Sequence, residues 1–149
     1  MQLKITLLTL IVLLTFSCKT TQSSYTPENF EGSKLTFGTE GGFAGTTSEY
    51  YIFENGQFFS FESRQEKAFE LNKIDKKIVN QIFDNYTTLG ISDMNLNDPG
   101  NLSYYIKMDS DAGEKVVKWG GMNEETPPIL KTYFKNLGQI ANKYKTVTQ

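Results

Sequence analysis

The chain of 149 residues contains no histidine and a single cysteine, Cys18. Histidine is the commonest general base and a frequent zinc ligand, so its absence removes most acid–base and zinc chemistry. One cysteine cannot form a disulfide within the chain or pair with a histidine as a nucleophile. The neighbouring carboxylates Glu124 and Glu125, and Glu62 with Glu66, stand near turns, where charged surface residues are ordinary. We therefore expect no enzyme, no catalytic residue, no cofactor and no metal site.

A strong charge of either sign is also missing. The chain has 15 basic and 17 acidic side chains, a net charge of −2, and no run of lysines or arginines inside the domain. Proteins that bind nucleic acid rely on basic patches to neutralise phosphates. We therefore expect no nucleic-acid partner.

Long apolar stretches are confined to residues 5–16, which are too few to span a bilayer. This run follows Lys4 and ends at Ser17, as in a secretory signal peptide. Because Cys18 comes directly after it, the segment resembles the lipobox of bacterial lipoproteins, in which the signal is cut before the cysteine and the cysteine is acylated. A plain secretory signal with a leftover thiol is the alternative.

The lipobox resemblance implies a domain layout and a location. Residues 1–17 would be the signal peptide, and the lipid on Cys18 would hold the protein to the membrane of a bacterial cell envelope, facing the periplasm. Residues 18–32 are polar, rich in serine and threonine, and contain Pro27, which is typical of a flexible tether. Residues 33–149 are then predicted to form one domain with its own hydrophobic core.

A glycine-rich segment stands out in the first part of this domain: Gly41, Gly42, Phe43, Ala44 and Gly45. Glycines give the backbone access to positive φ and allow another surface to approach closely. The segment is either an exposed loop that presents Phe43 to a partner, or a wide turn between two strands with Phe43 folded back as a lid on the core.

Aromatic residues and short alternating patterns predict strands on both sides of this loop and again in the second half of the domain. Asn55-Gly56 separates two such segments and predicts a hairpin with a type I′ turn. Residues 68–71 offer a short continuation of the sheet. Residues 109–113 contain two aspartates before a glycine, but the glutamate that a calcium loop needs is missing, so a hairpin turn is the better interpretation.

Two later segments have apolar residues every three or four positions, which predicts amphipathic helices. For the first, Asp75 is the expected N-cap and Gly90 the stop. For the second, Thr126 is the expected N-cap with Pro127 in the first helical position. The predicted fold is α+β: an antiparallel sheet of about four to five strands with two helices packed on it, in the order β-β-β-α-β-β-α.

Taken together, these features resemble the emfourin-like family of small inhibitors of thermolysin-like metallopeptidases such as protealysin. The residues that carry the resemblance are the glycine–phenylalanine block at 41–45, a strand with Tyr104 and Ile106, and a last helix that starts at prolines. The resemblance covers residues 34–140. It implies a binding module that blocks a metallopeptidase, with residues 41–45 as the partner-binding site.

Two hypotheses therefore stand. The first is a lipid-anchored envelope protein that inhibits a secreted or periplasmic metallopeptidase, and it expects Phe43 to be exposed. The second is an envelope lipoprotein with a structural or protein-interaction role, and it expects Phe43 to be buried, with a tight turn around it.

Overall fold

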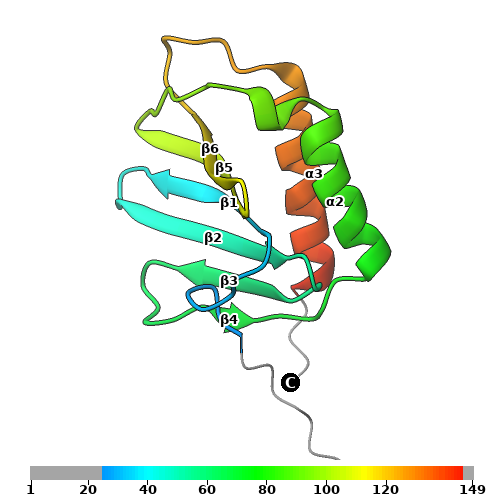
Figure 1. The fold of residues 1–149 in the computed structure, drawn as a ribbon. Helices are drawn as coiled ribbons and strands as arrows, with labels where there is room; N and C mark the ends of the chain where they lie inside the picture. Colours follow the sequence, from blue (N-terminus) through cyan, green and yellow to red (C-terminus); the bar gives the residue numbers. More distant parts are fainter. Residues whose placement is uncertain (1–24, 146–149) are drawn as a thin grey trace, which may run out of the picture.

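The computed structural model describes residues 25–145; the predicted signal peptide and Cys18 lie outside this range. The domain is α+β, with one antiparallel sheet and two helices that pack on the same face of it (Figure 1). The strands are β1 Lys34–Gly41, β2 Thr46–Phe53, β3 Phe58–Glu62, β4 Phe69–Glu70, β5 Leu102–Ser110 and β6 Gly113–Trp119. The helices are α2 Lys76–Thr88 and α3 Pro128–Tyr144, with a short 3₁₀ helix, η1, at Ile91–Asp93. Within 25–145, neither helix is long and apolar enough to cross a membrane.

The α+β class, the antiparallel sheet and the two helices confirm the expectation from sequence, but the number of strands does not. The sheet has six strands, in the order β4-β3-β2-β1-β5-β6. The additional strand, β4, contains two exposed residues that pair with Phe59 and Ser60 of β3. A segment of two residues is too short to show an alternating pattern, so the sequence offers only the suggestion of a continuation.

Strand β1 lies at the centre of the sheet and pairs along its whole length with β2 on one side and β5 on the other. Gly41 at its end is therefore opposite both Thr46 and Leu102, which is 61 positions later in the chain. This register brings the β1–β2 turn beside the loop that precedes β5.

The hairpin at Asn55-Gly56 forms as predicted, but the type I′ turn is wrong. Gly56 has φ of 91°, whereas no residue other than glycine has a positive φ in the described range. The amide of Gly56 donates to Phe53 and the amide of Phe53 donates to Gln57. This is a three-residue loop closed by a glycine bulge, the next commonest hairpin connection after the two-residue turn.

Both helix starts differ in detail from the prediction. Asp75 is the N-cap residue of α2, but its carboxylate makes no capping bond and instead accepts a hydrogen bond from the Tyr144 hydroxyl at 2.8 Å. Gly90 ends the helix with φ of 70°, as expected. Helix α3 begins one residue later than predicted, with Pro127 as N-cap and Pro128 as its first residue. Proline's fixed φ suits both positions.

The core lies between the helices and the face of the sheet toward them. Side chains alternate along each strand, so one set faces α2 and α3 and the other faces away. The buried residues of the core cluster from the strands are Leu35, Phe37, Ile52, Phe58, Ile106, Met108, Val117 and Trp119. Those from the two helices are Val79, Ile82, Tyr86, Leu130, Tyr133, Leu137 and Ala141.

The opposite face of the sheet, which we call the open face, is covered at one end by residues 25–32. The ring of Phe30 stacks on Phe53 of β2 with centroids 4.1 Å apart, and Lys34 donates to the carbonyl of Pro27. This segment was expected to belong to the tether. Its contacts show that residues 25–32 pack on the domain instead.

Candidate functional site

The predicted partner-binding residues form the turn between β1 and β2, at the left of the sheet in Figure 1. Gly41, Gly42 and Gly45 have φ of 94°, 73° and 58°, values that other residues rarely adopt. The Phe43 side chain between them is fully exposed, at 108% of its reference area, and Ala44 is exposed beside it. The turn therefore holds a large aromatic side chain in water.

The backbone of this turn is tied to the sheet. The amide of Gly42 donates to the carbonyl of Asn101 at 2.6 Å, and the amide of Gly45 donates to the carbonyl of Gly42 at 3.1 Å. A Cβ at Gly41 would collide with the Asn101 carbonyl, so only glycine fits there. The glycines thus allow positive φ and let the backbone of the turn lie close to Asn101, and the turn has a defined shape.

The two hypotheses differ in whether they expect the Phe43 side chain to be exposed or buried. The inhibitor hypothesis expects an exposed Phe43, which the structure confirms. The hypothesis of a structural role expects a buried Phe43, and this expected burial is wrong. A transfer free energy of about 1.5 to 3 kcal/mol is available when a phenylalanine is buried, so a partner that covered Phe43 would gain this contribution.

Two more exposed apolar side chains lie along the same end of the sheet. Leu102 is opposite Gly41 and is 42% exposed, and Met122, in the loop after β6, is fully exposed. A Cβ on Gly120 would collide with the carbonyl of Leu102, so the loop after β6 also packs against the start of β5. We call Phe43, Leu102 and Met122 the apolar rim. Only Phe43 was predicted from sequence.

A buried aspartate fixes the loop that carries Met122. Asp98 is 5% exposed, and its carboxylate accepts hydrogen bonds from the amides of Asn123 and Glu124 and from the Asn123 side chain, at 2.7 to 3.0 Å. These hydrogen bonds, that of the Asn123 side chain first, hold the pKa of Asp98 below its usual range. The amide of Gly121 also donates to the Asp98 carbonyl. Asp98 therefore stays ionised at neutral pH and fastens the loop.

A second polar arrangement lies on the open face. The carboxylate of Glu49 accepts hydrogen bonds from the hydroxyls of Tyr51 and Tyr105, one on each oxygen. Burial, and then the hydrogen bond to Glu49, raise the pKa of both tyrosines, so the phenols remain donors. Beside them, Lys118 pairs with Glu40 at 2.8 Å. Each charged or donating group here has a partner, which makes this a structural network rather than a reactive one.

In residues 25–145, no group of three or more acidic, histidine or cysteine side chains is placed to hold a metal ion. At this end of the sheet, the described residues present exposed apolar side chains on loops of defined shape. No protein-family model matches this chain, and no curated protein matches it either.

Proposed function

We propose that the protein is a lipid-anchored module of the bacterial cell envelope that inhibits a metallopeptidase through residues 41–45. The observation that carries the proposal is the fully exposed Phe43 on a turn held by three positive-φ glycines. Phe43 shares this end of the sheet with the exposed side chains of Leu102 and Met122, and exposed apolar side chains that gather in a patch are typical of interaction sites.

The mode of inhibition would be occlusion of the substrate cleft. Phe43 would enter an apolar specificity pocket of the peptidase, and the glycines on either side would let the backbone approach the cleft closely. Leu102 and Met122 would widen the apolar contact, because they lie along the same rim. The anchor at Cys18 and the envelope location rest on the lipobox resemblance of residues 1–18.

The test is a titration of the soluble protein, without its signal peptide, against a thermolysin-like peptidase, with residual activity on a peptide substrate as the readout. We expect stoichiometric loss of activity. Phe43→Ala is expected to raise the inhibition constant about fivefold or more, equivalent to about 1 kcal/mol or more of binding free energy, because the anchor side chain is removed.

A matched control uses another exposed phenylalanine. Phe69 is 48% exposed on β4, at the edge of the sheet away from the rim loops of β5 and β6. Phe69→Ala should leave the inhibition constant unchanged. Phe43→Ala should also change the free energy of unfolding by less than about 0.5 kcal/mol, because its side chain makes no buried contact.

Full peptidase activity in the presence of micromolar folded and uncleaved protein would contradict the inhibitor proposal. The structural or interaction role would then be the better account, and capture of cell-wall or membrane proteins would be its test. Equal inhibition by the wild-type protein and Phe43→Ala would instead remove residues 41–45 as the binding site.

A further inference from the structure

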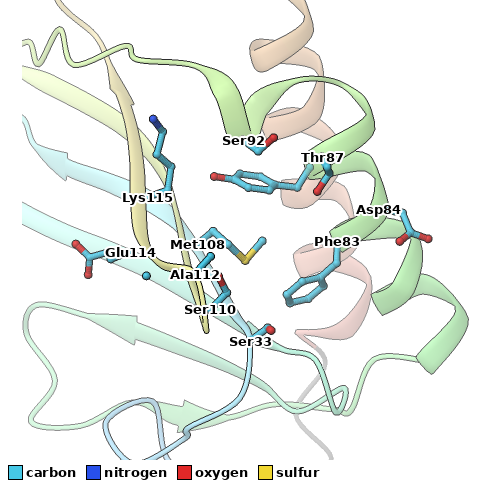
Figure 2. Close-up of a pocket in the computed structure, with 12 residues that line it drawn as sticks. Ser33, Phe83, Asp84, Thr87, Ser92, Met108, Ser110, Ala112, Glu114 and Lys115 are labelled. Carbon is cyan, nitrogen blue, oxygen red and sulfur yellow. The ribbon is translucent and has the colours of Figure 1, made fainter.

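A pocket of about 560 Å³ lies between α2 and the β5–β6 hairpin, away from the apolar rim. Figure 2 shows Phe83 of α2 and Met108 of β5 projecting toward the space between the helix and the hairpin, with Ser110 and Ala112 on the hairpin side. Apolar side chains from both elements thus line part of the pocket, and Gly113, Glu114 and Lys115 at the start of β6 line it as well.

One polar group in the wall of this pocket has no partner. Tyr86 is 4% exposed, and its hydroxyl is buried without a hydrogen bond among residues 25–145. The neighbouring buried tyrosine, Tyr133, donates to the carbonyl of Ile82 at 2.8 Å. Buried hydroxyls are almost always paired, so the Tyr86 hydroxyl is a donor in the wall of the pocket that lacks an acceptor among the described residues.

The outer edge of β6 is open beside the same pocket. Lys118 uses its outward backbone groups: its amide donates to Leu96 and its carbonyl accepts from Asp98, both at 3.0 Å. Backbone groups alternate in direction along a strand, so the amide and carbonyl of Val116 and of Glu114 also face outward. In the described part of the chain, no segment pairs with them, and both residues are exposed.

We propose that this groove binds an extended peptide, which adds as a short strand along β6 beside Val116 and places an apolar side chain in the pocket. Outward amides and carbonyls at a two-residue spacing are complementary to another extended backbone. Phe83 and Met108 would contact the inserted side chain, and the Tyr86 hydroxyl would donate to a carbonyl or side-chain oxygen of the peptide.

The charges around the groove are mixed in sign. Asp84 and Glu114 line it, and Glu114 pairs with Lys107 at 3.2 Å. Lys115, the lysine in its wall, donates to the neutral side chain of Asn95 at 2.6 Å, which leaves its positive charge uncompensated among the described residues. The pocket and the strand edge therefore define the partner: an extended segment with an apolar side chain for the pocket and polar side chains at alternate positions, which point to the opposite face of the sheet.

The test uses the full chain and a defined probe, a fluorescent, end-capped heptapeptide of alternating lysine and valine. Fluorescence anisotropy should give saturable binding, and amide shifts on binding should be centred on residues 113–116 and α2. Two further peptides lack backbone N–H donors at alternate positions, because the amides of the valines are N-methylated in one and those of the inner lysines in the other. Only one of the two sets of amides faces β6, so one of these peptides should bind about tenfold more weakly than the unmethylated peptide.

Variants of the protein test the same contacts from the other side. Val116→Pro removes the outward amide at an edge position where proline is tolerated, and we expect about tenfold weaker binding, whereas Val116→Thr keeps the amide and should bind as wild type does. Tyr86→Phe should weaken binding severalfold. Equal binding of both N-methylated peptides, shifts confined to the apolar rim, or dimerisation of the chain through β6 would overturn the proposal.

Discussion

The two faces of the sheet are built from the same strands and bury their side chains by different means. The face toward α2 and α3 carries Leu35, Ile52 and Ile106, each with no exposed area, against apolar helix residues. The open face carries Thr36, 1% exposed, and Tyr105, 6% exposed, although no helix of the described chain packs on it and residues 25–32 cover one end.

On the open face, side chains of the sheet cover one another. Gly38 lies between Glu49 and Tyr105 in the register, and with no side chain at Gly38 the Tyr105 hydroxyl can reach the Glu49 carboxylate across β1. The comparison shows that burial and apolar packing are separate properties. The helix face is buried because a second layer covers it. On the open face, Thr36 and Tyr105 are buried by neighbouring side chains of the sheet, whereas Glu49, Lys107 and Lys118 stay partly exposed.

The largest effect is expected on the helix face. Ile106→Ala removes a fully buried side chain of the core cluster and leaves a cavity, so we expect the free energy of unfolding to fall by about 2 to 5 kcal/mol. Urea denaturation followed by circular dichroism measures this change. A loss below about 1 kcal/mol would mean that the helices carry less of the stability than their burial indicates.

A smaller loss is expected for Gly38→Ala on the open face. An added Cβ would collide with the backbone of Ser48 on β2, which cannot move without breaking strand pairing, so we expect a loss of about 1 to 3 kcal/mol. Gly138→Ala in α3 is the matched control, since nothing lies within 4 Å of its Cβ position. That variant should gain about 0.5 to 1 kcal/mol from helix propensity. Equal effects of the two substitutions would refute the crowding at Gly38.

The smallest change, and one of opposite sign, is expected for Thr36→Val. The Thr36 hydroxyl is buried and has no hydrogen-bond partner in the described chain. Valine has the same shape without the unpaired polar group, so stability should be unchanged or rise by up to about 1 kcal/mol. A clear loss of stability in the same denaturation experiment would show that the hydroxyl has a partner, such as a water molecule, on the open face.

The helix face was the part of the fold that the sequence made predictable. Apolar residues at three- and four-residue spacing locate α2 and α3, and alternation locates the long strands, because each pattern reports one buried face. The details that were predicted wrongly are those for which two local conformations have similar free energies. The turn at Gly56 and the start of α3 differ from the prediction by one residue or one turn type, and β4 is too short to leave a pattern.

The candidate site was predictable only where it is local in sequence. The glycine block around Phe43 is visible because three glycines lie within five residues. Leu102 and Met122 join Phe43 through strand register and loop packing, which no local pattern reports. Asp98 belongs to a segment that looks like any polar turn, and its role depends on amides 25 and 26 residues later.

Residues 25–32 pack against one end of the sheet, so the two ends of the domain lie at different distances from the N-terminal segment. Phe30 stacks on Phe53, which is opposite Lys34 at the start of β1, whereas Phe43 follows the other end of that eight-residue strand. The two ends are separated by roughly 23 Å of strand. If Cys18 carries a lipid, as we propose, the Lys34 end is proximal to the bilayer and the Phe43 turn is distal. The apolar rim would then point toward proteins that arrive from the aqueous side, with the anchor out of their way.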